Sequence, residues 1–185
     1  MAFIQLLKKI RNEFLRKFKY RHYTIGTGLH SGARVRMWAK NKIVIGNNFY
    51  IGRDSFIESD VIIGNNVIWG NRVALIGRYD HNYQQIGTPI RLSESIRDTN
   101  YNWKGNDVIT IIEDDVWVGY GCTILSGVKI GEGSIIGASS LITKDVEAYS
   151  IYAGTPARKV KNRFASSEDL QNHLELVKSI YKGNL

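Results

Sequence analysis

The sequence predicts an all-β solenoid, a parallel β-helix of hexapeptide repeats with one inserted loop and an α-helix at each end. A strict period of six is the main observation, because it fits neither an amphipathic helix nor an alternating strand. It fits a short strand followed by a corner, repeated along the chain. Branched or large apolar residues recur at every sixth position in two blocks, Ile45, Ile51, Ile57, Ile63, Trp69 and Leu75, then Ile112, Val118, Ile124, Ile130, Ile136 and Ile142.

Composition agrees with this fold class. The chain has 185 residues, of which 43% are hydrophobic and only two are proline, as expected for one folded domain rather than a disordered chain. A β-sandwich with accidental spacing is the alternative, and twelve positions in phase make it improbable. No apolar run is long enough for a membrane span, and the N-terminus lacks the order of a secretory signal.

The other positions of the repeat indicate a triangular coil. The fifth residue of most units is small or β-branched, because three faces crowd at each inner corner; examples are Ser55, Val73, Cys122 and Ser134. Glycine and asparagine at the corners, as in 46–48 and 64–66, tolerate a positive φ. Three faces close a coil of about 18 residues. Weaker units starting near Ala33 and Ala39 are expected to precede the first block.

The two blocks are out of phase, so residues 78–109 are predicted to be an inserted loop. This segment is polar and irregular and carries Pro89, Tyr79, Tyr83, Tyr101 and Trp103. A solenoid tolerates long insertions at a corner, and such a loop in a compact domain is usually functional.

The net charge of +8 sits at the two ends of the chain. Residues 1–21 hold seven basic residues against Glu13 alone, a net charge of +6, and residues 156–185 have a net charge of +3. The segment 22–155 is close to neutral, at −1. Nucleic-acid proteins carry basic residues along a binding face, so this distribution argues against a nucleic-acid partner. We divide the chain into an N-terminal helix (1–21), a β-helix domain (22–164) and a C-terminal helix (165–185).

Residues 1–21 are predicted to be a basic amphipathic helix, whose apolar stripe is Phe3, Leu7, Ile10, Phe14 and Phe18. One interpretation is that the helix packs on the open end of the β-helix or on a neighbouring subunit, since a solenoid needs caps. The other is contact with an anionic membrane surface. We favour packing and keep peripheral contact at the inner face of the membrane as the alternative.

The C-terminal helix is predicted from an apolar stripe, Leu170, Leu174, Val177, Ile180 and Tyr181. Ser166 and Asp169 can start it in a capping-box-like arrangement, and Gly183 lies past its expected end. The single cysteine excludes an internal disulfide framework and fits a reducing compartment, so a cytoplasmic location is expected. Cys122 occupies a fifth repeat position and is expected in the core.

The chain resembles the hexapeptide-repeat acetyltransferases with a left-handed β-helix, in the branch of maltose, galactoside and colanic-acid O-acetyltransferases. The resemblance covers roughly residues 33–164. It rests on the ordered set Asp114-Asp115-Val116-Trp117, Thr143-Lys144-Asp145-Val146 and Gly154-Thr155-Pro156-Ala157-Arg158. The hexapeptide alone would indicate only the fold.

This resemblance implies acetyl-CoA as cosubstrate and a homotrimer with active sites between subunits. No metal is expected, since only His81 among the histidines is well placed. It implies that His81 is the catalytic histidine and that Trp117 lies beside the pantetheine arm of coenzyme A. Backbone groups of Tyr120 and Ala138 are expected to bind that arm. Thr143 and Lys144 are expected nearer the adenine, and Arg158 and Lys161 near the phosphates. Tyr120 is bulkier than the family's usual small residue.

Histidine suits the chemistry, because its reference pKa near 6.5 lets it take a hydroxyl proton near neutral pH. His22, His30 and His173 are expected to be surface or packing residues. Asp80 can orient the His81 ring, although neighbours on a strand point apart, so a backbone carbonyl or another carboxylate is an equal candidate. Asn82 and Tyr83 are candidate acceptor contacts.

The leading hypothesis is an O-acetyltransferase that acts on a carbohydrate, such as a cell-surface polysaccharide unit or its precursor. The alternatives with the same fold are an N-acetyltransferase on a nucleotide-linked amino sugar and a drug-inactivating acetyltransferase. A zinc carbonic anhydrase needs three converging histidines, and only His81 is well placed. A non-catalytic or ice-binding coil predicts rows of threonine and no inserted loop, and neither pattern occurs.

Overall fold

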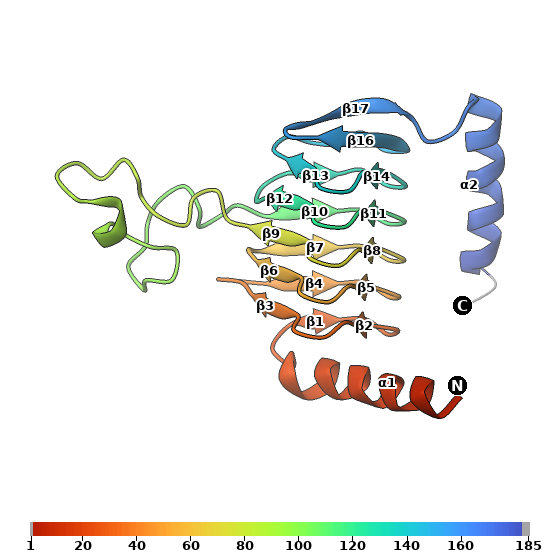
Figure 1. The fold of residues 1–185 in the computed structure, drawn as a ribbon, viewed down its shortest axis with the longest axis horizontal. Coiled ribbons are helices and arrows are strands. Elements are labelled where there is room, and N and C mark those ends of the chain that lie inside the picture. Colours follow the sequence, from red (N-terminus) through yellow and green to blue (C-terminus); the bar gives the residue numbers. More distant parts are fainter. Residues whose placement is uncertain (1, 183–185) are drawn as a thin grey trace.

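A computed structural model describes residues 2–182 and has the predicted architecture, a β-solenoid with a helix at each end (Figure 1). Within this range the strands form three sheets of five, seven and five members. Sheet A contains β1 (Thr24–Ile25), β4 (Ile43–Ile45), β7 (Val61–Ile63), β10 (Thr110–Ile112) and β13 (Lys129–Ile130). Sheet B contains β2 (His30–Ser31), β5 (Tyr50–Ile51), β8 (Ile68–Trp69), β11 (Trp117–Val118), β14 (Ile135–Ile136), β16 (Ser150–Gly154) and β17 (Ala157–Asn162). Sheet C contains β3 (Arg36–Trp38), β6 (Phe56–Glu58), β9 (Ala74–Ile76), β12 (Thr123–Leu125) and β15 (Leu141–Ile142).

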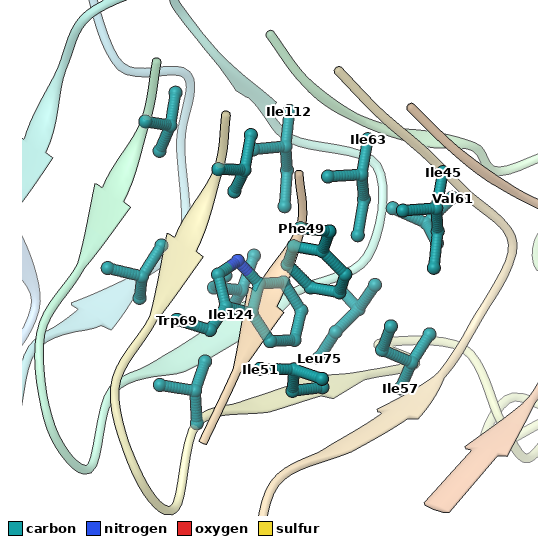
Figure 2. Packing of buried hydrophobic residues seen from close by; sticks show 14 of the residues in the cluster. Ile45, Phe49, Ile51, Ile57, Val61, Ile63, Trp69, Leu75, Ile112 and Ile124 are labelled. Atoms are coloured by element: carbon teal, nitrogen blue, oxygen red, sulfur yellow. The ribbon is translucent and has the colours of Figure 1, made fainter. Parts of the chain in front are cut away.

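Each strand pairs in parallel with its counterparts in the adjacent coils, and the antiparallel hairpin of β16 and β17 closes the C-terminal end. All twelve predicted inward positions are buried. Trp69 is the largest of these side chains, and its ring meets Phe49 edge-on at 5.6 Å between centroids (Figure 2). Because each fully buried aliphatic side chain contributes about 1.5–3 kcal/mol, this apolar column stabilises the solenoid.

The corners are built as the repeat predicts. The fifth positions Ser134 and Ser140 are buried, and their hydroxyls donate to the carbonyls of Gly131 and Gly137, each at 2.6 Å. At the corner between sheets A and B, Asn48 and Asn66 have φ angles of 59° and 56°. Cys122 is buried, as expected, and burial raises the pKa of its thiol.

The first coil departs from the predicted phase. Ile25, Ser31 and Met37 align with Ile45, Ile51 and Ile57, so each is 20 residues from its partner instead of 18. The expected units starting at Ala33 and Ala39 are therefore wrong: Ala33 is exposed, and the inward positions lie two residues earlier. The reason is a longer corner between β3 and β4, which includes Lys40 and Asn41.

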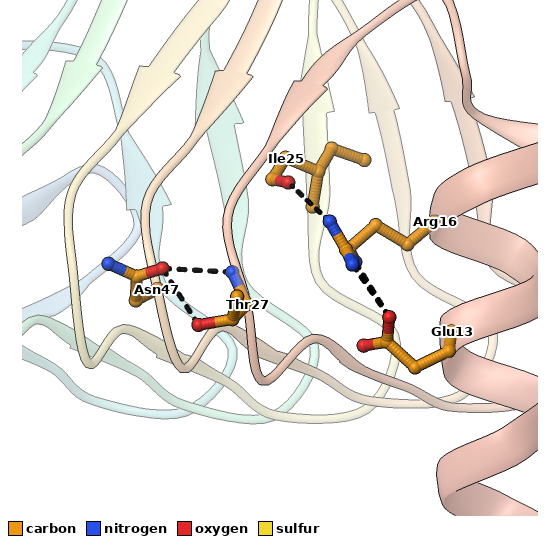
Figure 3. A network of polar contacts seen from close by, with 5 residues as sticks. All are labelled: Glu13, Arg16, Ile25, Thr27 and Asn47. Atoms are coloured by element: carbon orange, nitrogen blue, oxygen red, sulfur yellow. Dashed lines mark hydrogen bonds and ion pairs between the residues drawn. The ribbon is translucent and has the colours of Figure 1, made fainter.

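The N-terminal segment forms α1 (Ala2–Phe14), continues as a π-helical turn (Leu15–Lys19) and lies across the end of the coil stack (Figure 1). Tyr20 enters the core and donates through its hydroxyl to the Val35 carbonyl at 3.1 Å. Arg16 donates to the Glu13 carboxylate at 2.6 Å and to the Ile25 carbonyl at 3.4 Å (Figure 3). The same figure shows the Asn47 side chain accepting from Thr27 of the adjacent coil.

The apolar stripe of α1 does not pack on the coil. Phe3, Leu7, Ile10, Phe14 and Phe18 are each about half exposed or more. The helix does lie across the open end of the β-helix, as the first interpretation expects, but its apolar stripe is not the side that covers that end. Its polar side faces the coil instead, where Asn12 is buried and accepts a hydrogen bond from the Ser31 amide at 3.4 Å.

The C-terminal helix α2 (Ser167–Lys182) runs beside the solenoid (Figure 1). Its start has the predicted cap: the Asp169 amide donates to the Ser166 hydroxyl at 3.0 Å, and that hydroxyl donates to the Asp169 carboxylate at 2.8 Å. His173 packs on Phe164, with ring centroids 4.8 Å apart. Gly183 lies outside the described residues. No helix within residues 2–182 is long and apolar enough to cross a membrane.

Candidate functional site

The predicted inserted loop leaves the solenoid between β9 and β10, at the corner between sheets C and A, and extends away from the coils (Figure 1). It contains a short 3-10 turn (Ile90–Leu92). Near its start, His81 forms an antiparallel bridge with Ser95. The Ile96 amide donates to the Asp80 carbonyl at 2.8 Å and the Asn82 amide to the Glu94 carbonyl at 2.9 Å. The backbone around His81 is therefore held from both sides within the loop.

His81 is partly buried, and its Nδ1 atom is buried without a hydrogen-bond partner. Asp80 makes no hydrogen bond to the ring; its carboxylate lies over Gly77, where an added Cβ would collide with it. Burial raises the pKa of Asp80, as does the nearby Glu58 carboxylate, whereas His81 and Arg97 lower it. Within this chain, neither Asp80 nor a backbone carbonyl orients the His81 ring through Nδ1.

The other two predicted acceptor contacts, Asn82 and Tyr83, differ in how far their side chains are already engaged within the loop. Asn82 is engaged in the loop, since its side chain donates to the Glu94 carboxylate at 3.4 Å and accepts from the Gln84 amide at 3.2 Å. Tyr83 is half exposed and meets the Trp103 ring edge-on at 4.7 Å. Tyr79 meets the same indole at 5.5 Å. His81 is thus flanked in the chain by an aromatic cluster.

The loop is tied to the coil by residues for which the sequence analysis gave no role. Tyr101 is buried, donates through its hydroxyl to the Tyr79 carbonyl at 2.6 Å and accepts from the Gly105 amide at 3.1 Å. The Lys40 ammonium lies 4.7 Å from the centre of the Tyr101 ring. Asn41 donates to the Asn106 carbonyl at 3.1 Å. The only sequence signal for these contacts is the phase break that introduces Lys40 and Asn41.

Arg78 connects the base of the loop to the last coils. Its amide donates to the Ser126 hydroxyl at 3.0 Å, and its guanidinium donates to the Thr143 carbonyl at 3.2 Å. The contact between the guanidinium and Thr143 spans 65 residues. Proximity of this kind follows from the stacking of coils and not from local sequence.

Three of the predicted coenzyme A contacts line one cavity. Thr143, Lys144 and Arg158 surround a hollow of about 330 Å³ at the C-terminal end of the coil, together with Lys159, Tyr152 and Ala157. Lys161 does not line it and belongs to a separate hollow with Arg163 and Phe164. The lysine and arginine side chains make this cavity suited to an anion. Asp145 also lines it.

The remaining predicted contacts lie elsewhere on the coil. Trp117 is 53% exposed, as expected for an outward position, and lies on sheet B. Tyr120 and Ala138 follow on the adjoining corner, where the Tyr120 carbonyl accepts from the Ser139 amide at 2.7 Å and its hydroxyl accepts from Arg72 at 2.9 Å. This group is remote from the corner that carries the His81 loop (Figure 1). One chain therefore does not bring all predicted site residues together.

The described residues hold no group of three histidine, cysteine or acidic side chains that could bind a metal ion. His30 stacks on Tyr50 with ring centroids 4.6 Å apart, and the His22 ring meets that of Tyr23 at a tilt, with centroids 4.0 Å apart. With His173 on Phe164, these histidines make packing contacts, as expected.

Residues 109–144 match the family model described as bacterial transferase hexapeptide (six repeats). The chain is 51% identical over 59 residues to a chloramphenicol acetyltransferase from Klebsiella aerogenes, covering 32% of this chain and 28% of that protein. It is 51% identical over 67 residues to a probable macrolide acetyltransferase from Lysinibacillus sphaericus, covering 36% and 37%. Among solved structures, a maltose O-acetyltransferase from Clostridium difficile 630 superposes with a TM-score of 0.53. That pair is 24% identical, with 87% and 84% of the two chains covered.

The matched segments span well under half of the two curated relatives, and the structural likeness, at low identity, concerns the fold. Both kinds of comparison agree with the period of six and with the observed β-solenoid. They confirm the predicted resemblance: residues 109–144 match the model of the hexapeptide bacterial transferases, and both curated relatives are named as acetyltransferases.

Proposed function

We propose that the protein is an acetyl-CoA-dependent O-acetyltransferase that transfers an acetyl group to a hydroxyl of a carbohydrate. The observation that carries this proposal is His81, a partly buried imidazole held on a loop at the same corner of the solenoid as a cation-lined cavity. The relatives' acetyltransferase names agree with the reaction class.

In this mechanism His81 is the general base. Its Nδ1 is buried, which leaves Nε2 to take the proton from the acceptor hydroxyl. The hydroxyl oxygen forms the new bond to the thioester carbonyl carbon, and the carbon–sulfur bond then breaks. The imidazolium returns its proton to the leaving thiolate, so the histidine ends in its starting form. Base catalysis of this kind contributes about 10²–10⁴-fold to the rate.

The donor site fits acetyl-CoA, which supplies the acetyl group. Lys144, Arg158 and Lys159 offer charged donors to its phosphates, and Thr143 lies beside them. Trp117 offers an exposed indole to the apolar part of the ligand. We assign Lys161 a weaker role, because it lines a different hollow.

We further propose a homotrimer whose sites lie between subunits. The support is that one chain carries the His81 loop and the Trp117, Tyr120 and Ala138 group on different parts of the coil. A neighbouring copy can set the second group against the first. A monomer in light scattering at assay concentration contradicts this assembly.

The acceptor is proposed from the loop. Tyr79, Trp103 and Tyr83 next to His81 offer the aromatic surface that polar ligands with apolar faces require. A drug hydroxyl is the second candidate, favoured by the two relatives named as chloramphenicol and macrolide acetyltransferases. A nucleotide-linked amino sugar, acetylated on nitrogen, is the third. The lone cysteine favours a cytoplasmic enzyme.

The test is release of free thiol from acetyl-CoA in the presence of acceptors from the three classes. Carbohydrate hydroxyls are expected to give turnover, and His81→Ala is expected to reduce it about 10²–10⁴-fold. His22→Ala is the matched control, since His22 is exposed and far from the loop in sequence. Full transfer by His81→Ala to the true acceptor contradicts the mechanism. Turnover only with chloramphenicol or with an amino sugar would show that the acceptor is a drug or an amino sugar and not a carbohydrate hydroxyl.

A further inference from the structure

The N-terminal helix presents its apolar face in the wrong direction for a helix that serves only as a cap. An amphipathic helix on a globular domain normally turns its apolar stripe to the core. Here Phe3, Leu7, Ile10 and Phe14 are 49–70% exposed, and Asn12, half a turn round the helix from Ile10, is buried on the coil. The coil thus holds the polar side of α1 and leaves the apolar side outward.

The polar side is fixed to the coil by specific contacts. Asn12 accepts from the Ser31 amide, and the Arg11 guanidinium donates to the Ser31 carbonyl and to the Asn12 side chain. In the turn that follows, Arg16 donates to the Ile25 carbonyl. These bonds set the rotation of the helix about its axis, so the exposed stripe is a consequence of how α1 is attached.

The position of α1 leaves its apolar stripe accessible to a flat surface. The helix lies across the N-terminal end of the coil stack, roughly perpendicular to the direction in which the coils stack (Figure 1). The stripe lies on the side of the helix opposite the buried Asn12, away from the coil. A flat surface can therefore meet the whole stripe without contacting the inserted loop or α2, which lie at the sides of the solenoid.

The positive charge of the N-terminal segment favours an anionic surface as the partner of the stripe. Residues 1–21 carry a net charge of +6, whereas residues 22–155 carry −1. Lys8, Lys9 and Lys17 are exposed, and the acidic Glu13 is already paired with Arg16 at 2.6 Å. Stripe-to-stripe packing of two copies would bring two strongly basic segments together. An anionic surface instead attracts the basic residues, each worth about 1 kcal/mol near such a membrane.

We propose that α1 is an interfacial helix that docks the protein on an anionic phospholipid surface, with Phe3, Leu7, Ile10 and Phe14 entering the headgroup boundary. The exposed lysines of this segment, Lys8, Lys9 and Lys17, are attracted to the lipid phosphates. Docking in this way is independent of the acetyl transfer proposed above, because no residue of α1 belongs to that site.

The first experiment is flotation of the full-length protein with phosphatidylcholine vesicles, with and without phosphatidylglycerol. The protein is expected to float only with the anionic lipid and to be released by high salt, because salt screens the attraction. Absence of binding to anionic vesicles, or equal binding to both kinds, overturns the proposal.

Two double variants separate the contributions. Lys8→Gln with Lys9→Gln is expected to weaken binding to anionic vesicles about 30-fold, from about 1 kcal/mol for each basic residue. Leu7→Ser with Phe14→Ser is expected to abolish flotation. Leu92→Ser is the matched control, since Leu92 is 73% exposed on the inserted loop, and it is expected to bind as the natural protein does.

Light scattering of the same variants distinguishes a lipid surface from a second copy. The stripe is exposed, so the thermal midpoint and the subunit number without vesicles are expected to stay unchanged in Leu7→Ser with Phe14→Ser. A loss of subunits in that variant, with vesicle binding retained, assigns the stripe to another copy of the chain and overturns the proposal. Acetyl transfer to a soluble acceptor is expected to persist in both α1 double variants, which keeps this test apart from that of His81.

Discussion

Tyr101 gives the sharpest test of how the loop holds His81. The change is Tyr101→Phe, which removes one hydroxyl from a buried ring and leaves its shape intact. That hydroxyl donates to the Tyr79 carbonyl at 2.6 Å and accepts from the Gly105 amide at 3.1 Å. Because the site is buried, both backbone groups lose their partner without gaining water.

The loss of free energy can be estimated from the Tyr79 carbonyl and the Gly105 amide, which both lose their partner. A buried polar group left without a partner costs about 1–3 kcal/mol, so the loop loses about 2 kcal/mol or more of the free energy that holds it closed. Its opening equilibrium then shifts by at least about 30-fold. The β-helix itself should keep its stability, because its core contacts lie in the coils and not in the loop.

Hydrogen exchange measured by mass spectrometry tests this directly. Amides of residues 94–106 are expected to exchange at least about 30-fold faster in Tyr101→Phe, while those of the solenoid strands keep their rates. Thiol release from acetyl-CoA should fall in parallel, because Tyr79 is two residues from His81. Tyr50→Phe is the control, since Tyr50 is 41% exposed on sheet B. Unchanged loop exchange in Tyr101→Phe would show that the Tyr101 hydroxyl does not hold the loop closed.

Three further predictions concern the core and the base of the loop. Trp69→Ala leaves a cavity beside Phe49 and is expected to destabilise the fold by about 3–5 kcal/mol, measured by denaturant unfolding; a cost under about 1 kcal/mol would show that the column is loosely packed. Gly77→Ala places a Cβ against the Asp80 carboxylate, so it should lower acetyl transfer while the solenoid's circular dichroism persists. Burial and Glu58 raise the pKa of Asp80, so the folded state holds this proton to higher pH than the unfolded state. Unfolding free energy should therefore fall as the pH rises from about 4 through the raised pKa, and Asp80→Asn should flatten this dependence; an equal slope in both proteins would contradict the assignment.

Much of the coil could be predicted because its rule is local. A side chain at the first repeat position points inward in every coil, and a small or β-branched residue at the fifth position fits the inner corner. Both requirements recur every six residues along the chain. Ile45 and Ile142, in different coils, therefore meet the same requirement for an inward apolar side chain. The prediction failed in the first coil, where the longer corner with Lys40 and Asn41 shifts the phase by two residues.

The candidate site was predictable only in part. The resemblance pointed to Thr143, Lys144 and Arg158, and these residues do line one cavity. Lys161 lines another, because β17 continues past the cavity as an antiparallel strand. The partner of the His81 ring could not be inferred either, since Asp80 turns back over Gly77 instead of toward the imidazole.

The order of residues is enough to predict the solenoid, the inserted loop, the two terminal helices and the basic, amphipathic character of the first helix. Each of these depends on the order and spacing of nearby residues. Residue order did not predict which side of α1 meets the coil, or how Tyr101 and Lys40 hold the loop against the coil; these follow from the folded arrangement. The physical reason is that these choices depend on hydrogen bonds and packing between distant segments. Asn12 bonds the Ser31 amide of the first coil, 19 residues away, and the apolar stripe lies on the opposite side of the helix.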